Sequence, residues 1–484
     1  MPRLAARGLI GLRLVAGFYS SSRLSCCSSF LIEYYADSER TKVKYCHLRN
    51  LLWIAAIFLF VAPSSLRGQE APEGFHAIFN GKDLSGWYAV KTQDPREFNK
   101  LSAAEQKAKV SAARAATGEF WRVENGELVN DGQGPFLTTD AEYRDFELMI
   151  EYKTVARADS GIYLKATPQV QIWDYTDEAK FKIGSDKGSG GLWNNPKELG
   201  GKDPLVKADK PFGEWNKFLI RQIGSRTSVW LNGEMVVDNV VMNNYWGKKN
   251  GLPLIAQGPI QLQTHGGEIR WRNVFVRELE SAEANKMLDT AGDAGFESIY
   301  NGKNLDGWKG PLGNYEIVDG AIRCKAGKGG TIHTEDEYAD FVARLEFKLP
   351  PGGNNGLAIR YPGKGDTAYM GMCELQVLDN ESKKFAGKLD DRQYHGSAYG
   401  MAAAHRGYHR PVGDWNFQEV TVKGSTIKVE LNGTVILDTD LSKINEYKSD
   451  TKHPGKTRTS GFFGLAGHND PVEFRNLRIK KLEK

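Results

Sequence analysis

Gly74-Phe-His-Ala-Ile-Phe-Asn-Gly-Lys-Asp-Leu-Ser-Gly-Trp87 returns later in the chain as Gly295-Phe-Glu-Ser-Ile-Tyr-Asn-Gly-Lys-Asn-Leu-Asp-Gly-Trp308. Further matching pairs follow in the same order, among them Gly213-Glu-Trp-Asn216 with Gly413-Asp-Trp-Asn416 and Leu231-Asn-Gly233 with Leu431-Asn-Gly433. A period of roughly 200 residues is too long for a solenoid and suits one β-sandwich per copy. The chain therefore contains a duplicated domain.

The composition is that of a folded, turn-rich protein. The 484 residues include 11 Trp and 53 Gly, and the net charge is only +4. A disordered chain would be poorer in aromatic residues. The basic residues are scattered, so the electrostatic footprint of a nucleic-acid-binding protein is absent and no nucleic-acid partner is expected.

The N-terminal part of the sequence predicts export. Residues 51–62 form an apolar run that is short for a transmembrane helix, which needs about 20 residues. We expect residues 1–68 to comprise an N-terminal extension and a signal peptide, and the protein to be secreted or periplasmic. An uncleaved membrane anchor is the alternative, because no Ala-x-Ala cleavage site follows. Beyond this leader only Cys324 and Cys373 remain, either as buried thiols or as a pair.

Short alternations of apolar and polar residues dominate both copies. Phe146–Tyr152 and Phe341–Phe347 are examples, and their two-residue period predicts half-buried antiparallel strands. Asn-Gly between two such runs predicts a tight hairpin. We therefore expect an all-β fold with two tandem β-sandwiches, at residues 74–279 and 295–482, joined by a linker at 280–294.

Each copy has an insertion of its own. Leu101–Ala116 is rich in Ala, Lys and Glu, which predicts a helix inserted into the first sandwich only. We expect this helix to shape a rim or a partner contact. The second copy has a longer loop at Tyr361–Met372. Loops at the edge of a sandwich are common places for specificity.

Polar residues interrupt an otherwise apolar strand in each copy, where an unpaired carboxylate would be costly to bury. In the second copy Glu374 and Gln376 share one face of the strand, and Asp379 falls on the other. On the concave side of a sheet such a polar face would bind sugar hydroxyls, and a solvated outer face is an equal alternative. The first copy has Gln169, Gln171 and Asp174 at the corresponding positions.

Histidine, arginine and tyrosine residues complete the candidates. His265 and His468 each follow an apolar strand, where a lone histidine is more often structural than catalytic, although its pKa near 6.5 suits proton transfer. Arg272 and Arg475 precede Asn in the final strand, where an arginine most often pairs with a buried carboxylate and less often holds an anion. Tyr399 could stack on a sugar ring, although a packed loop aromatic is the commoner case.

Several familiar chemistries have no motif in this chain. The sequence contains no Gly-x-Ser-x-Gly elbow, phosphate-binding loop, His-Glu-x-x-His or Cys-x-x-Cys pattern. The Glu-x-Asp-x-x-Glu strand of laminarinase-like glycosidases is also absent, which argues against ordinary two-carboxylate hydrolysis.

The ordered succession of motifs resembles the 3-keto-disaccharide hydrolase domain family. The resemblance covers Gly74 to Leu279 and Gly295 to Leu482, and the motifs that carry it include Phe-Asn-Gly-Lys-Asp-Leu-Ser-Gly-Trp, Asn-Asn-Gly-Leu, Glu-Leu-Gln-Val-Leu-Asp, Gly-Asp-Trp-Asn and His followed by Phe-Arg-Asn. That family has a concanavalin A-like jelly-roll fold and occurs in exported bacterial proteins. Its described members cleave glycosidic bonds of sugars oxidised to a ketone at C3. The resemblance implies an exported hydrolase, and a lectin-like protein without catalysis is the alternative.

The chemistry that the resemblance implies needs a base, an enolate stabiliser and an acid for the leaving oxygen. Glu374 or Asp379 would share the proton transfers with His468, while Arg475 and Arg360 would hold the developing oxyanion. A divalent metal could replace an arginine, but no feature of the sequence fixes one. The residues predicted to bind substrate are Gln376, Arg360 and Tyr399 in the second copy and Gln171, Asp174, His265 and Arg272 in the first.

The two copies depart from each other at the catalytic positions. The first has Gln169 where the second has Glu374, and Lys165 where the second has Arg360. We therefore predict that the second copy is the catalyst. The first is predicted to be a second enzyme or a binding module.

Overall fold

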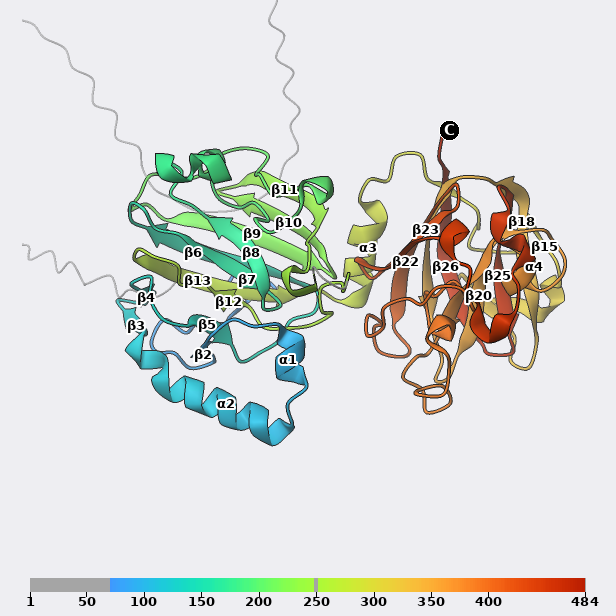
Figure 1. Ribbon diagram of the computed structural model, residues 1–484, viewed down its shortest axis with the longest axis horizontal. Coiled ribbons are helices and arrows are strands. Elements are labelled where there is room, and N and C mark those ends of the chain that lie inside the picture. The colour runs from blue at the N-terminus through green and yellow to red at the C-terminus, as the bar shows by residue number, and fades with distance from the viewer. Residues whose placement is uncertain (1–69, 248–250, 484) are drawn as a thin grey trace, which may run out of the picture. The chain divides into compact units, whose positions relative to one another are not determined.

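The computed structural model describes residues 70–247 and 251–483, which form two β-sandwiches, each with an eight-stranded and a five-stranded sheet (Figure 1). The predicted all-β fold with two tandem sandwiches is confirmed. The predicted signal peptide or anchor within residues 1–68 lies outside the described residues. Within the two described ranges, no helix combines the length and the apolar character needed to cross a membrane.

The first sandwich consists of thirteen antiparallel strands. Its eight-stranded sheet has the order β11 (Glu234–Val241), β10 (Arg226–Leu231), β9 (Asn216–Ile223), β6 (Phe146–Thr154), β13 (Ile269–Glu278), β4 (Glu127–Asn130) and β3 (Trp121–Glu124), with β1 (His76–Ala77) paired to β13. Its five-stranded sheet has the order β2 (Trp87–Val90), β5 (Phe136–Thr139), β12 (Gln261–Leu262), β7 (Ser160–Leu164) and β8 (Thr167–Ile172).

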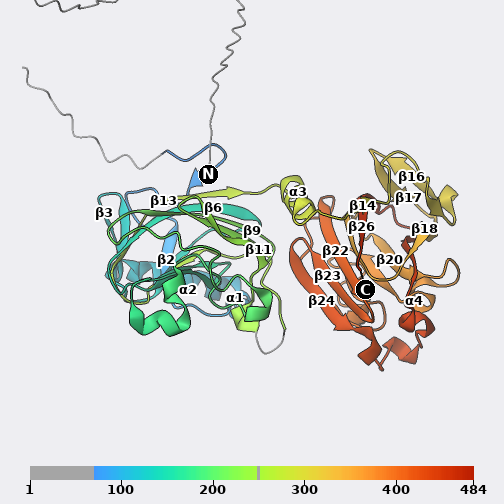
Figure 2. The same cartoon turned by 90° about the horizontal axis from the view of Figure 1, so that it is seen from above.

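The second sandwich repeats this arrangement strand for strand. Its eight-stranded sheet has the order β16 (Tyr315–Val318), β17 (Ala321–Cys324), β26 (Glu473–Lys481), β19 (Phe341–Lys348), β22 (Trp415–Lys423), β23 (Thr426–Leu431) and β24 (Thr434–Asp440), with β14 (Glu297–Ser298) paired to β26. Its five-stranded sheet has the order β15 (Trp308–Lys309), β18 (Gly329–Tyr338), β25 (Gly461–His468), β20 (Asn354–Tyr361) and β21 (Cys373–Leu378). Figure 2 shows β22, β23 and β24 in one layer of this sandwich and β18 and β20 in the other.

The repeated opening motif fixes a turn that places a tryptophan in each core. Trp87 is fully buried, and its Nε1 donates to the Ile78 carbonyl at 2.6 Å. Trp308 is buried in the same way, with Nε1 donating to the Ile299 carbonyl at 2.9 Å. The carboxamide of Asn80 accepts backbone N–H groups within the turn, as does that of Asn301. The motif therefore serves the fold of each sandwich.

The two Asn-Gly hairpins are also present. Asn232 and Gly233 have positive φ angles of 53° and 94°, and Asn432 and Gly433 have 49° and 80°. Two consecutive positive φ angles are the signature of the turn that suits the twist of paired strands. These turns connect β10 to β11 and β23 to β24.

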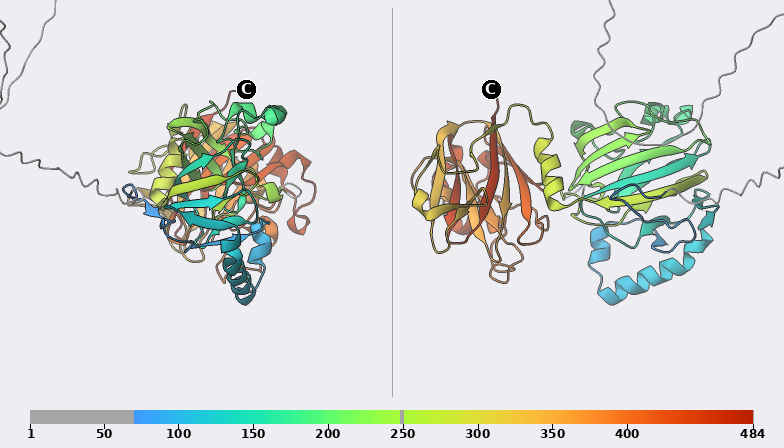
Figure 3. Two further views of the ribbon diagram at one scale, coloured as in Figure 1. Left: turned by 90° about the vertical axis from the view of Figure 1, so that its left-hand side faces the viewer. Right: turned by 180° about the vertical axis from the view of Figure 1, so that it is seen from behind.

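The predicted helical insertion in the first sandwich is confirmed. It contains α1 (Pro95–Asn99) and α2 (Ala103–Ala116), and a reciprocal capping box of Ser102 and Glu105 begins α2. None of the residues of α2 is buried, and the helix runs along the outside of the sandwich (Figure 3). Its structure therefore follows from local propensity and capping more than from burial.

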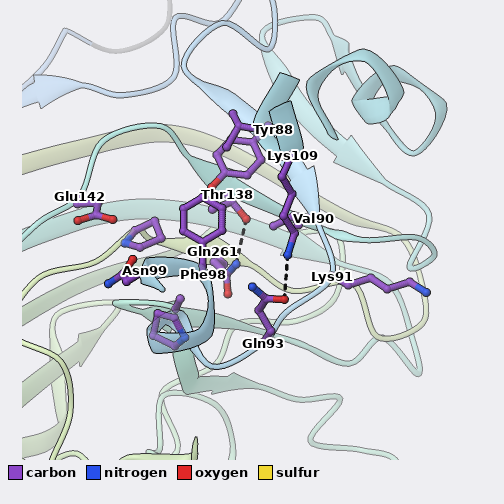
Figure 4. Close-up of a pocket in the computed structure, with 14 residues that line it drawn as sticks. Tyr88, Val90, Lys91, Gln93, Phe98, Asn99, Lys109, Thr138, Glu142 and Gln261 are labelled. Carbon is purple, nitrogen blue, oxygen red and sulfur yellow. Dashed lines mark hydrogen bonds between the residues drawn. The ribbon is translucent and has the colours of Figure 1, made fainter. Parts of the chain in front are cut away.

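A small cavity lies between this insertion and the five-stranded sheet (Figure 4). Tyr88, Phe98 and Thr138 contribute to its lining, and Lys109 Nζ donates to Gln93 Oε1 at 3.1 Å across it. Its volume of about 50 Å³ is far below that of a typical ligand pocket. We assign it no functional role.

The remaining helices are short. The linker contains α3 (Ser281–Thr290), whose Asn285 donates to Glu346 Oε2 at 3.1 Å, and the longer loop of the second copy contains α4 (Thr367–Met370). Single 3-10 turns occupy Thr117–Glu119, Glu178–Ile183, Ser185–Lys187, Lys197–Leu199, Tyr245–Gly247, Leu312–Asn314, Asp391–Gln393, Leu441–Lys443, Lys448–Asp450 and Pro454–Thr457. Cys324 and Cys373 are buried free thiols, so of the two predicted alternatives the unpaired one is observed.

Candidate active site

A polar pocket of about 240 Å³ opens on the five-stranded sheet of the second sandwich. Glu374, Gln376 and Leu378 of β21 line it, while Leu375 and Val377 point into the hydrophobic core. The predicted division of this strand into two faces is confirmed. The polar face lines a pocket, so the alternative of a solvated outer face is wrong. The full lining is Asn354, Asp366, Ala368, Tyr369, Glu374, Gln376, Leu378, Phe385, Leu389, Gln393, Tyr399 and His468.

A glycine on the neighbouring strand makes room for the buried carboxylate. Gly356 of β20 lies opposite Gln376 in the register, and a Cβ placed on Gly356 would overlap the carboxylate end of Glu374. The Glu374 side chain therefore lies across the backbone of β20. This contact gives a physical reason for glycine in the motif Asn354-Asn-Gly356.

Glu374 and His468 form a hydrogen-bonded pair at the centre of the pocket. His468 Nε2 lies 3.0 Å from Glu374 Oε1, and the exposed side-chain fractions are 44% for the histidine and 4% for the glutamate. Because a carboxylate only accepts hydrogen bonds, Nε2 carries the proton and Nδ1 of the neutral ring keeps a lone pair. The hydrogen bond to Glu374 raises the pKa of His468 above its ordinary value, against the opposing effect of burial. The pair combines a buried carboxylate with an accessible base.

Other groups around this pair can bind hydroxyls. Gln376 Nε2 donates to Asn354 Oδ1 at 2.6 Å, and Gln393 Nε2 donates to the Tyr399 hydroxyl at 2.9 Å. Tyr399 therefore lines the pocket as an acceptor whose own proton remains available. The longer loop of the second copy adds Asp366 and Tyr369 to the wall, in agreement with the expected role of such loops in specificity.

Asp379 and Asp174 lie outside the two polar pockets and close turns. Asp379 Oδ2 accepts the backbone N–H of Gly352 at 2.8 Å, just before β20. Asp174 Oδ2 accepts the N–H of Arg157 at 2.6 Å, just before β7. Each carboxylate is thus used to hold a loop against the strand that follows, and we give neither a role in proton transfer or in substrate binding.

Arg360 is likewise buried away from the pocket. It is 1% exposed and donates to the carbonyls of Ala339, Gly424 and Arg458 and to Asp340 Oδ1, at 2.7 to 2.8 Å. Burial lowers the pKa of its guanidinium. Its substitute in the first copy, Lys165, is also fully buried and donates to the Gly224 carbonyl at 2.8 Å. These cations tie the strand to a hairpin, and neither lines the pocket of its sandwich.

Arg475 and Arg272 lie on the opposite sheets, in strands β26 and β13. Arg475 pairs with Glu346 at 2.8 Å, and its guanidinium stacks over Trp415 at 4.0 Å from the ring centroid. Arg272 pairs with Glu151 at 2.7 Å and stacks over Trp215 at 4.0 Å. The commoner interpretation of these arginines, pairing with a buried carboxylate, is the one observed. No arginine or lysine is among the residues that line the second-sandwich pocket.

The first sandwich has a pocket at the equivalent place, with a volume of about 380 Å³. Gln169 and Gln171 of β8 form its floor together with Gln263, which follows β12. Gln169 Nε2 donates to Gln171 Oε1 and to Gln263 Oε1, the latter at 3.2 Å. The amide that replaces Glu374 is therefore engaged by two neighbouring amides and does not reach the histidine.

His265 nevertheless has a carboxylate partner, and it comes from the residue just before β7. His265 Nδ1 lies 3.1 Å from Asp159 Oδ2, and this hydrogen bond raises the pKa of the imidazole. Asp159 occupies the position of Asn354, because Gln171 donates to Asp159 just as Gln376 donates to Asn354. Each sandwich thus keeps one carboxylate beside its histidine.

Asp159 was not among the predicted site residues, although the sequence contained a signal for it. Where the first copy has Gln169 in place of Glu374, it has Asp159 in place of Asn354. The two exchanges are complementary, which suggests that a carboxylate moved and was not lost. The aromatic wall formed by Trp193 and Trp246 was also missed. Trp193 stands where the second copy has Tyr399, since its N–H donates to the Gln169 carbonyl as that of Tyr399 donates to the Glu374 carbonyl.

The residues present do not form a metal site. Within residues 70–247 and 251–483, no three His, Cys, Asp or Glu side chains come together in a way that could hold a metal ion. The divalent metal considered from the sequence therefore lacks a matching set of ligands in the described part of the chain.

The fold and the pockets define a tandem β-sandwich protein with one polar, histidine-containing pocket on each five-stranded sheet. The sequence profile of the 3-keto-alpha-glucoside-1,2-lyase-like domain matches residues 74–277 and 295–480, which is more than half of the chain. The chain belongs to this family. A curated relative from Bacteroides thetaiotaomicron, named 3-keto-disaccharide hydrolase, is 28% identical over 251 residues, which cover 43% of this chain and 86% of the relative.

Solved structures with related folds also match one part of the chain each. A candidate glycosyl hydrolase from Parabacteroides distasonis is 28% identical, with a TM-score of 0.35 and coverage of 39% of this chain and 99% of that one. The carbohydrate-binding module CBM66 from Bacillus subtilis is 13% identical, with a TM-score of 0.24 and coverage of 37% and 98%. At the level of the family, the protein is a hydrolase-like carbohydrate-active protein.

Proposed function

We propose that the second sandwich cleaves the glycosidic bond of a 3-keto-glucoside. The family description and the name of the Bacteroides relative supply the substrate class. The observation that carries the proposal is the pairing of His468 Nε2 with Glu374 Oε1 at 3.0 Å inside a polar pocket. A buried carboxylate behind an accessible imidazole orients the ring and stabilises its protonated form.

The first step is removal of the proton at C2. The ketone at C3 acidifies this proton, and Nδ1 of His468 accepts it while Nε2 stays bound to Glu374. The electron pair of the C2–H bond becomes part of an enolate whose charge rests on the C3 oxygen. Because the enolate lies next to C1, it expels the C1 substituent, and the imidazolium of His468 returns the proton to the leaving oxygen.

The enolate needs a hydrogen-bond donor in the pocket. Tyr399 accepts a hydrogen bond from Gln393, so its own O–H can donate to the C3 oxygen. Gln376 uses one of its amide hydrogens on Asn354 and retains the other for a substrate oxygen. These neutral donors take the role that the sequence had assigned to Arg360 and Arg475.

Water completes the reaction. Elimination leaves a C1–C2 double bond conjugated with the ketone, and water adds its oxygen to C1 and a proton to C2. The products are 3-keto-glucose and the free alcohol of the aglycone, so the net reaction is a hydrolysis. A direct displacement of the C1 substituent by water would give the same products without loss of the C2 proton.

The test is turnover of a 3-keto-α-glucoside by the full chain in D₂O, followed by mass spectrometry against boiled protein. We expect released aglycone and 3-keto-glucose that carries one deuterium at C2. The controls are the product incubated with boiled protein and the unoxidised glucoside, which lacks the acidic C2 proton and should stay intact. Turnover without deuterium would contradict the elimination. Absence of turnover on several 3-keto-glucosides would contradict the proposal and favour a lectin-like protein.

We also propose that the protein is exported. The support is the apolar run at residues 51–62 and the basic residues before it. Fractionation of the source cells tests this point, since an exported protein is found in the periplasm or the medium and a retained anchor leaves it with the membrane fraction. Recovery in the cytoplasm alone would contradict export.

A further inference from the structure

Three tryptophans line the pocket of the first sandwich, whereas the aromatic residues in the lining of the second pocket are Tyr369, Phe385 and Tyr399. Trp173 and Trp193 meet edge to face with their ring centroids 5.1 Å apart, and Tyr245 and Trp246 meet in the same way at 5.0 Å. All four residues line the pocket of about 380 Å³. Tryptophan and tyrosine combine a broad apolar ring with one polar N–H or O–H group. They suit a pyranose, which has an apolar face of C–H groups and hydroxyl groups around its edge.

The floor of this pocket is built for hydroxyl groups. Gln169, Gln171 and Gln263 contribute three side-chain amides, each with two donor hydrogens and an acceptor oxygen. Gln169 Nε2 donates to the oxygens of the other two amides, and Gln171 Nε2 donates to Asp159 and to two backbone carbonyls. The amide groups left for a ligand are therefore Gln169 Oε1 and Gln263 Nε2. A sugar hydroxyl both donates and accepts, so it can bind to an amide floor in more than one way.

The acid-base groups of this pocket are already engaged with one another. Asp159 accepts from Gln171 at 2.8 Å and from Lys180 at 2.9 Å, in addition to its pairing with His265 at 3.1 Å. The Lys180 ammonium compensates the charge of Asp159. In the second sandwich Glu374 pairs with His468, and no lysine or arginine lines the pocket. The first pocket is therefore close to neutral, and its histidine is held by a carboxylate that is shared with a lysine.

We propose that the first sandwich holds a neutral pyranose unit of a glucan in this pocket without cleaving it. The chain then carries one pocket for binding and one for cleavage. Binding does not require a ketone at C3, because stacking on Trp193 and hydrogen bonds to the amide floor recognise an intact sugar. The inference rests on the proposed function only for the choice of glucose as the sugar.

The experiment is isothermal titration calorimetry of the full chain with maltotetraose, an unoxidised glucan on which the second pocket has no C2 proton to remove. We expect one site per chain and a loss of affinity of about tenfold or more in Trp193→Ala. Trp230→Ala is the matched control, because Trp230 is partly buried on β10 of the other sheet and should leave the affinity unchanged.

A second variant separates loss of binding from loss of folding. Tyr245 is 39% exposed, so Tyr245→Ala should keep the thermal unfolding of the parent chain while weakening maltotetraose binding. Absence of binding in the parent chain, or unchanged affinity in both Trp193→Ala and Tyr245→Ala, would overturn the inference. Turnover of 3-keto-glucosides is measured separately, so a chain that cleaves and does not bind maltotetraose refutes this inference alone. A chain that binds and does not cleave refutes the proposed function alone.

Discussion

The pockets of the two sandwiches are built on equivalent strands and differ in the segment of the chain that provides the carboxylate. In the second sandwich Glu374 of β21 reaches Nε2 of His468, and in the first Asp159, just before β7, reaches Nδ1 of His265. The two imidazoles therefore present opposite nitrogens to a ligand. Both copies keep a histidine beside a carboxylate, but the nitrogen available for proton transfer is different in each.

The surroundings of the two carboxylates differ as well. Asp159 shares its charge with Lys180, whereas no lysine or arginine lines the pocket of Glu374. The hydrogen bond to Glu374 can thus act on His468 without competition from a nearby ammonium group. A duplicated fold can in this way assign catalysis to one copy and recognition to the other, through a few exchanges on neighbouring strands.

The largest effect is expected from removal of the base. His468→Gln should lower kcat for a 3-keto-glucoside by about 10²- to 10⁴-fold, because His468 is the one imidazole among the residues that line this pocket. The measurement is the initial rate of aglycone release. His76→Gln changes an exposed histidine on β1 and is the matched control. A His468→Gln chain with more than about a tenth of the parental rate would contradict the assignment of the base.

The next comparison concerns the two buried cations. Arg360→Met should lower the free energy of unfolding by about 3–5 kcal/mol, because three carbonyls and Asp340 lose a buried donor. Lys165→Met should cost much less, since Lys165 holds only the Gly224 carbonyl and burial lowers its pKa to about 8. Urea unfolding measures both. Equal losses in the two variants would contradict this difference.

The Lys165 pKa also gives a pH dependence with a definite sign. Between pH 8 and 10.5 the folded chain has released the Lys165 proton while the unfolded chain still binds it, so stability rises with pH in that window. Lys165→Met should remove this rise. A rise that persists unchanged in the variant would show that another group causes it.

A smaller effect is expected from adding a methyl group at Gly356 of β20. Gly356→Ala should lower turnover about ten- to hundredfold, because the added methyl group overlaps the Glu374 carboxylate and displaces it from His468. The φ angle of Gly356 is not in the left-handed region, so any loss of stability comes from displacement of the buried Glu374 side chain and not from backbone strain. Gly161→Ala is the counterpart in the first sandwich and should leave turnover unchanged. Full turnover in Gly356→Ala would contradict the claim that Gly356 makes room for the Glu374 carboxylate.

The smallest effect is a shift in one titration curve. NMR should give His468 a pKa above 6.5, and Glu374→Gln should lower it, because the neutral amide no longer stabilises the imidazolium. The His265 curve serves as the internal control and should not move. Since the base form of His468 grows as pH rises through its raised pKa, kcat/KM should increase across the same window. An unchanged His468 curve in the variant would contradict the pairing.

Much of the fold could be predicted from the sequence because its causes are local. The two-residue alternation around Glu374 and Gln376 correctly separated pocket from core, and the Asn-Gly pairs marked the hairpins. The inserted helix was predicted from its composition and begins with a capping box. Each of these signals is contained within one element, so no knowledge of strand pairing was needed.

The candidate site could be predicted only in part, because its contacts join distant parts of the chain. Glu374 and His468 are 94 residues apart, and their meeting depends on the order β25-β20-β21 in the sheet. The positions of the Arg360 and Arg475 side chains likewise depend on the order of strands in the sheets. The local sequence does not show whether an arginine will lie buried beside carbonyl groups or in a pocket. That depends on which strands become its neighbours.

The most direct test of the account is the residual turnover of a 3-keto-α-glucoside by the Glu374→Gln chain, measured over a prolonged incubation. Glu381→Gln, an exposed change nearby in sequence, is the control for loss of a negative charge. The account predicts that Glu374→Gln folds like the parent and releases almost no aglycone, because the second pocket is the one that cleaves. Release at a substantial fraction of the parental rate would contradict it and would point to cleavage in the pocket of the first sandwich.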